Sequence, residues 1–256
     1  RVTGCWKIRR VTHARLQQPH WERTRQACQA RGEYLLIEDT TALDFTTHWA
    51  AAGLGRIGDD RGRGFHVHTT LALRIERWVA HEPVLNALGL FWQQVWARDD
   101  EPKKGRESRA ARLGRKRESE RWAVALAQAG DSPPGTHWTL VADREADIAE
   151  VFIKARHHAT GFIIRACQPR AVELEEGNLF AVAARAPLKG EFCIELRARP
   201  GQAARTATVQ VRARELRVRG PWRPGGHLPP QTVNEIQMQE KWIVCEECAR
   251  ILYWMP

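Results

Sequence analysis

The chain has 256 residues, of which 43% are hydrophobic, enough apolar material for a sizeable core. Its 40 Lys and Arg residues against 30 Asp and Glu residues give a net charge of +10, a balance that attracts polyanions. No apolar run reaches the roughly 18 residues that span a bilayer, and no secretory signal is recognisable, so we expect a cytoplasmic protein without a membrane partner.

The positive charge is grouped in two blocks. Residues 1–31 hold eight Arg or Lys residues and a single acid, Glu22, while residues 197–219 hold seven Arg residues and a single acid, Glu215. The chain opens with Arg1 rather than Met, so we expect that its natural N-terminus is missing. We interpret the basic residues 1–31 as an N-terminal remnant or a linker. Segregated positive charge of this kind favours binding to phosphates.

Short apolar strands and helices alternate along the chain, which predicts an α/β fold. In chain order we expect strands at 34–39, 66–75 and 88–97, a helix from near 118 to 129, a strand at 138–143, a helix at 146–158 and a strand at 161–165. Residues 179–219 then alternate with a period of two, which predicts an inserted antiparallel β subdomain with an Arg-rich face.

Two of the predicted strands end in an aspartate, Asp39 and Asp143. Active sites of open α/β sheets gather at the carboxyl ends of strands, and two or three carboxylates there can hold a pair of Mg²⁺ ions about 4 Å apart. The alternative is that each aspartate merely caps the following turn, which is the commoner role for a carboxylate after a strand.

Other metal ligands are less favoured by the pattern. Of the six cysteines only Cys245 and Cys248 form a CxxC pair, whereas a zinc ribbon needs two such pairs. His66 and His68 lie two residues apart on one strand face and could bind a metal, but an ordinary strand face is the preferred interpretation.

Local sequence around both aspartates resembles the IS4 family of cut-and-paste DNA transposases, the Tn5-like DDE enzymes. Residues 38–45 (EDTTALDF) resemble the first catalytic motif, residues 143–148 (DREADI) the second, and residues 161–170 (GFIIRACQPR) the strand that follows it. Further family-like segments occur in the same order, namely residues 53–55, 61–64, 66–68 and 93–98. The resemblance covers about residues 19–233.

The resemblance implies an RNase H-like mixed sheet at 32–170 with a β insertion subdomain at 171–233. It implies that Asp39 and Asp143 are catalytic and bind Mg²⁺ or Mn²⁺, for phosphodiester hydrolysis at transposon ends and strand transfer to target DNA. The implied partners are DNA and a second copy of the chain on paired ends, in the nucleoid of a bacterial cytoplasm. The implied DNA contacts are Arg165, Arg144, Arg61, Arg63 and Trp242.

Three residues of these motifs have alternatives. Arg144 could instead form an ion pair with a neighbouring carboxylate. Glu145 and Asp147 flank the implied metal site, but we expect them to cap or pair rather than to bind metal. The assignment of Trp242 as a base-stacking residue rests on a weak likeness of residues 241–244 to the strand that carries such a residue in the family.

The third motif of the family, Tyr-x2-Arg-x3-Glu-x6-Lys, is absent, because no Arg in the chain is followed four positions later by Glu. We therefore expect a chain truncated before the catalytic Glu helix, with a divergent tail at 234–256. The carboxylates of that tail are poor substitutes: Glu235, Glu240, Glu246 and Glu247. Two other hypotheses remain, a non-catalytic DNA-binding transposase remnant and an RNase H-like nuclease with other substrates.

Overall fold

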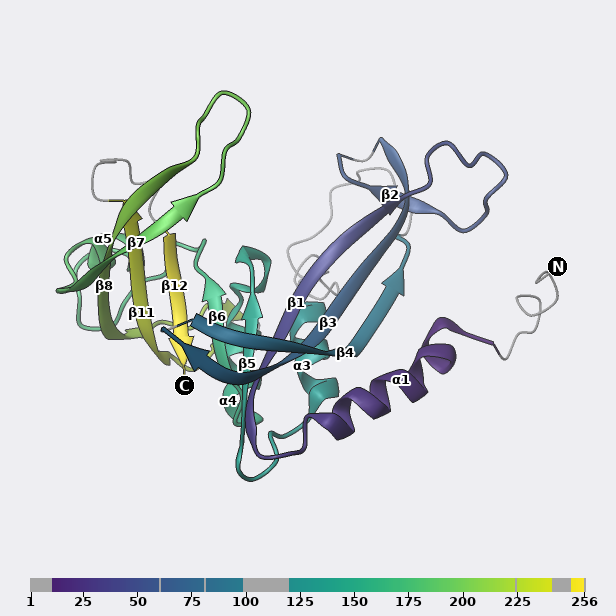
Figure 1. Ribbon diagram of the computed structural model, residues 1–256, viewed down its shortest axis with the longest axis horizontal. Coiled ribbons are helices and arrows are strands. Elements are labelled where there is room, and N and C mark those ends of the chain that lie inside the picture. The colour runs from purple at the N-terminus through teal and green to yellow at the C-terminus, as the bar shows by residue number, and fades with distance from the viewer. Residues whose placement is uncertain are drawn as a thin grey trace. The chain divides into compact units, whose positions relative to one another are not determined.

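The computed structural model describes residues 11–59, 61–80, 82–98, 120–223, 225–240 and 250–255 (Figure 1). The fold is mixed α/β, as predicted, and the chain divides into two compact units. The first comprises Arg1–Val141 and Lys154–Thr160, and the second comprises Ala142–Ile153 and Gly161–Pro256. Within the described ranges, no helix combines the length and apolar character required to cross a bilayer.

The first unit is built on a sheet in which the long strand β3 pairs antiparallel with β1, β2 and β4. The strand order is β2-β3-β1-β5, with β4 paired to β3. Its elements are α1 (His13–Ala27), β1 (Gly32–Asp44), β2 (Gly55–Ile57), β3 (Gly62–Val79), β4 (Glu82–Trp96), α3 (Glu120–Ala129) and β5 (Thr136–Ala142).

Alternation along β1 sets the core of this unit. Tyr34, Leu36 and Glu38 are buried on one face of the strand, so Asp39 lies on the opposite face, where it is exposed. Helix α1 starts at Thr12, whose hydroxyl caps the helix by accepting the N–H of Arg15, and packs along β4. The core cluster unites Trp21, Cys28, Tyr34, Leu36, Ala72, Phe91, Trp92, Ala125 and Trp138.

Strand β1 is longer than the sequence pattern predicts. The apolar run ends at Asp39, but the ladder with β3 continues from the pair Asp39–Thr69 to the pair Asp44–Gly64. Residues 40–44 are mostly exposed, so their strand conformation comes from backbone pairing with β3 rather than from burial. Asp39 therefore lies within a strand and not at the strand end where we placed it.

Gly64 is required by close backbone contact in this ladder. A Cβ built on Gly64 would lie 1.9 Å from the carbonyl oxygen of Leu43, which cannot move without breaking the sheet. We expect Gly64→Ala to lower the free energy of unfolding by roughly 1–3 kcal/mol, the usual cost of overpacking. The matched control is Gly190→Ala on a strand of the second unit, where the added Cβ meets no atom within 4 Å. Urea denaturation of both variants measures the effect, and equal stabilities would contradict it.

The second unit is an antiparallel sheet with the order β6-β12-β11-β8-β7. Two short helices are associated with it, together with the first part of α4, in which the boundary between the units falls. The elements are η2 (Arg144–Ala146), α4 (Ala149–His157), β6 (Gly161–Arg165), α5 (Leu179–Ala184), β7 (Leu188–Leu196), β8 (Arg205–Val218), β9 (Trp222–Arg223), β10 (Gly226–His227), β11 (Gln231–Glu240) and β12 (Arg250–Met255).

The segment that we expected to be a divergent tail contributes two strands to this sheet. Strand β11 starts within the predicted insertion and continues past Val233 to Glu240. Strand β12 lies between β11 and β6, where Leu252 pairs with Arg165. The strands of the predicted insertion at 171–233 therefore belong to the same sheet as β6, joined to it by β12 of the tail. The insertion forms no separate compact unit.

Candidate functional site

Asp39 presents an accessible carboxylate on β1. Its only hydrogen bond to a described residue comes from the hydroxyl of Thr41, at 3.4 Å to Oδ2, which is long for such a bond. The side chain is exposed, and the backbone around it is fixed by the ladder with β3. A carboxylate held this way can accept a cation without first losing another partner.

Behind Asp39, on the buried face of the same strands, lies a polar pair formed by Glu38 and His68. His68 Nε2 is 3.5 Å from Glu38 Oε2, and both side chains are essentially inaccessible. Thr70 donates to Glu38 Oε1 at 3.1 Å, while Thr40 Oγ1 lies 2.8 Å from His68 Nδ1. Burial raises the pKa of Glu38, and its contacts with His68 and Thr70 oppose that rise.

The histidines of β3 are buried in the core, whereas the sequence predicts an ordinary strand face for them. The ring of His66 stacks on Trp96 at 5.3 Å between centroids, and the ring of His68 packs edge-on against Trp122 at 4.6 Å. His66 is buried like His68. Neither ring is placed to reach a metal ion at the exposed face that holds Asp39.

Asp143 follows β5 and caps the short helix η2. One carboxylate oxygen, Oδ1, accepts the backbone N–H of Glu145 at 2.8 Å, while the side chain stays exposed. The capping role, which is the alternative to metal binding, is therefore observed. It uses one oxygen only, and Oδ2 has no hydrogen-bond partner among the residues that the structure covers, so capping leaves room for a cation.

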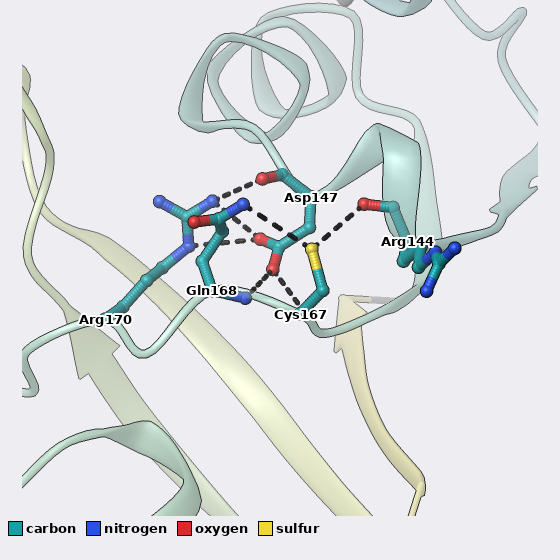
Figure 2. A network of polar contacts seen from close by, with 5 residues as sticks. All are labelled: Arg144, Asp147, Cys167, Gln168 and Arg170. Carbon is teal, nitrogen blue, oxygen red and sulfur yellow. Dashed lines mark hydrogen bonds and ion pairs between the residues drawn. The ribbon is translucent and has the colours of Figure 1, made fainter. Parts of the chain in front are cut away.

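Asp147 has a different environment, in which every oxygen is occupied (Figure 2). Its Oδ2 accepts the backbone N–H groups of Cys167 and Gln168 at 2.7 and 2.8 Å. Its Oδ1 accepts Nε and Nη2 of Arg170 at 3.1 and 2.6 Å, and Nη2 also donates to the Asp147 carbonyl oxygen. The prediction that Asp147 forms a polar pair is confirmed.

This Asp147 network ties the turn after Asp143 to the loop after β6. The thiol of Cys167 donates to the carbonyl oxygen of Arg144 at 3.3 Å (Figure 2). The guanidinium of Arg170 lies over the ring of Phe152, which stacks on Phe162 of β6 at 5.0 Å between centroids. The network therefore fixes the backbone on both sides of η2 within the second unit, and with it the orientation of Asp143.

Two of the predicted DNA contacts are available arginines of the second unit. Arg144 is exposed and Arg165 is half-buried on β6. Neither side chain forms an ion pair or hydrogen bond with any residue in the described ranges, so the ion-pair alternative for Arg144 is not observed there. In Figure 2 the side chain of Arg144 points away from the carboxylate of Asp147.

The predicted DNA-contacting arginines of the first unit, Arg61 and Arg63, already interact with other residues of the unit. Arg61 is highly exposed and lies 3.6 Å from Asp59, a surface pair of small energetic value. Arg63 donates from Nη2 to the carbonyl oxygen of Leu54 at 2.7 Å and so helps to close the loop between β1 and β2. Trp242, the remaining predicted contact, lies outside the described residues, as do Cys245, Cys248, Glu246 and Glu247.

Three arginines of β8, in the region where the sequence predicts an Arg-rich face, are engaged within the second unit. Arg217 pairs with Glu173 at 2.9 Å and Arg214 pairs with Glu175. Arg212 donates to the carbonyl oxygen of Ala186 at 2.9 Å. Arg214 and Arg217 hold the segment before α5 on the sheet and Arg212 holds the residues after it, so much of this positive charge is used within the unit.

Glu235, one of the tail carboxylates, is fully buried on β11, where solvent and ions have no access to it. Because it is buried, Glu235 is a poor candidate for the third carboxylate of a metal site. In the part of the chain that the structure describes, no group of three His, Cys, Asp or Glu side chains is arranged to hold a metal ion.

The two aspartates belong to different units, Asp39 to the first and Asp143 to the second. Each is described above within its own unit. No protein-family model matches the chain, and no curated protein matches its sequence.

Proposed function

We propose that the chain carries the catalytic core of a DDE transposase of the IS4 type, with an RNase H-like fold, and that Asp39 and Asp143 are its first two carboxylates. The observation that carries the proposal is a contrast among the acidic residues of the motifs. Asp39 and Asp143 are exposed and keep free oxygens, whereas Glu38 and Asp147 are buried and engaged. Of these four carboxylates, the two accessible ones are those that the motifs assign to chemistry, while Asp44 and Glu145 of the same motifs are exposed as well.

Each of these two carboxylates, by itself, offers oxygen ligands that suit a hard divalent cation. Carboxylate oxygens are the ligands that Mg²⁺ and Mn²⁺ prefer. Bound there, such ions would activate an attacking hydroxyl and stabilise the leaving oxygen of a phosphodiester. The chain itself supplies rigid supports: the β1–β3 ladder beneath Asp39, and the capped turn and Asp147 network around Asp143.

DNA is the proposed substrate because the chain is strongly basic and two arginines of the motif region are unpaired within the described residues. Arg144 directly follows Asp143, and Arg165 ends the next strand of the unit. Guanidinium groups at these positions suit phosphate oxygens, which they bind in a bidentate manner. A homodimer on paired ends and a place in the bacterial nucleoid belong to the same proposal.

A second candidate function is a non-catalytic DNA-binding transposase remnant. It is favoured by the absence of the Tyr-x2-Arg-x3-Glu motif from the 256 residues and by the burial of Glu235. Such a protein would bind transposon ends through its arginines and leave them intact. The two functions differ in one readout, which is metal-dependent cleavage.

The test is incubation of the full chain with a supercoiled plasmid carrying candidate element ends, in Mg²⁺ and then in Mn²⁺, beside a binding assay over a salt series. We expect nicked or linear products that require the metal, and an affinity that falls steeply with salt because phosphate contacts release counterions. Salt-sensitive binding without cleavage in either metal would favour the remnant. Affinity that is independent of salt would contradict both functions.

A further inference from the structure

Glu235 lies on β11, the central strand of the second unit, flanked by β8 and β12 (Figure 1), and its side chain is completely inaccessible. Neither of its carboxylate oxygens accepts a hydrogen bond from any residue that the structure describes. A buried ionised carboxylate without hydrogen bonds is very costly, so the folded chain favours the neutral acid. Consistent with this, burial raises the pKa of Glu235 from 4.5 to about 7.

Among the described residues, Arg214 is the cation that acts on the pKa of Glu235. Gln231 and Gln237 share its buried strand face, and each also has a buried, unpaired Oε1. Helix α5, which packs on β8 and β11, has the sequence LFAVAA and contributes no ionisable group. On β12, Tyr253 is the residue opposite Glu235 in the backbone register, and Arg250 is opposite Met238.

On the other side, β8 places Arg214 directly opposite Glu235 in the register. Arg214 acts to lower the pKa of Glu235, against the larger effect of burial. Its guanidinium is, however, already paired with Glu175, in the segment 171–178 that leads into α5. That segment is also held by Glu173, which pairs with Arg217 and whose N–H donates to the Arg217 carbonyl oxygen at 2.8 Å.

We propose that Glu235 is a proton-operated switch of the second unit. With its proton in place, the neutral acid is tolerated in the sheet and Arg214 stays with Glu175. When the proton leaves for solvent, the buried anion opposes the packing of the sheet and competes with Glu175 for Arg214, which loosens segment 171–178. The inference does not rest on the proposed function, since it concerns the stability of one unit alone.

The sign of the pH dependence follows from the two protonation states. Because the folded chain binds this proton more tightly than the unfolded chain, the stability due to neutral Glu235 is complete below pH 4.5 and is lost as the pH rises to about 7. Across that window the folding equilibrium constant falls by up to about tenfold per pH unit, on the order of 100-fold in all.

The experiment compares urea unfolding of the full chain from pH 4.5 to 8.5 with that of two variants. Glu235→Gln keeps the size of the side chain and removes the titrating proton. Between pH 4.5 and about 7, the free energy of unfolding of the wild type should therefore fall relative to that of the variant. Glu215→Gln is the matched control, because Glu215 lies on the neighbouring strand β8 with its side chain exposed. It should follow the wild type, and a Glu235→Gln curve parallel to both would overturn the switch.

Two further measurements keep the inference testable if Glu235→Gln fails to fold. The carboxyl carbon of Glu235 in the wild type, followed by NMR, should titrate with a midpoint near 7, whereas a midpoint below 5 would refute the proposal. Hydrogen exchange at the amide of Glu173, corrected for its intrinsic pH dependence, should accelerate between pH 6 and 8. Unchanged protection there would exclude the loosening of segment 171–178.

Discussion

Asp143→Asn should abolish metal-dependent cleavage while leaving the fold of the second unit intact. The asparagine keeps the side-chain oxygen that accepts the N–H of Glu145, so the cap of η2 is preserved. It removes the negative charge that a divalent cation requires. Losing a residue that only orients a metal ligand costs about 10–100-fold, and loss of the ligand itself should cost at least about 100-fold.

The matched control is Glu145→Gln, the same change from carboxylate to amide two residues further on. Glu145 is exposed and contacts Asp143 through its backbone rather than its carboxylate, so its replacement should preserve cleavage within a few fold. Asp39→Asn should repeat the loss seen with Asp143→Asn. Product formation is measured on the plasmid carrying candidate ends, with DNA affinity measured in parallel. Cleavage by Asp143→Asn at the wild-type rate would refute the assignment of the metal ligand.

Asp147→Ala should destabilise the second unit by about 3–5 kcal/mol, the usual cost of removing one partner from a buried ion pair. The side chain of Asp147 is completely buried, and that of Arg170 is 10% exposed. Replacing Asp147 removes the carboxylate that pairs with Arg170 and that accepts two backbone N–H groups, those of Cys167 and Gln168. Urea unfolding measures the loss, with Glu145→Ala in the same turn as an exposed control.

A double-mutant cycle distinguishes pairing from packing at this site. Arg170→Met removes the cation but keeps an apolar side chain of similar length over the ring of Phe152. If the interaction between the two residues stabilises the unit, the free energy of unfolding lost in the double variant should be clearly less than the sum of the losses in the two single variants. A loss below 1 kcal/mol for Asp147→Ala, or strict additivity, would show that the pair contributes little.

The strands that the sequence predicts best are those with uninterrupted apolar runs. The segment Gly161–Arg165 is a strand at the predicted bounds, because the β-forming residues Phe162, Ile163 and Ile164 form an uninterrupted apolar run. Helix α3 ends at Ala129 as predicted, and its predicted start near residue 118 lies outside the described residues. The end of β1 is missed because residues 40–44 are polar and exposed, and only the partner strand β3 makes them extended.

In the candidate site, too, the features that depend on neighbouring residues could be predicted from the sequence, and those that depend on distant residues could not. The roles of Asp143 as a cap and of Asp147 as a paired residue could be anticipated, since both depend on the residue type beside a turn. The partner of Asp147 could not be inferred, because Arg170 is 23 positions away and reaches it through the loop after β6. Pairing of the β8 arginines with Glu173 and Glu175 is equally invisible to a pattern that counts charge along one strand.

Strand β12 also determines when this protein can fold during synthesis. Strand β6 pairs with residues 250–255. Arg165 can therefore pair with Leu252 only after 87 further residues have been made. Until then β6 has an open edge, and unpaired edges invite association with other chains. The first unit takes its strands from earlier in the chain, and all of it has been made before β6 is translated. On the ribosome, the unit with Asp39 can therefore form first, whereas the unit with Asp143 keeps the open edge of β6 until residues 250–255 have been made.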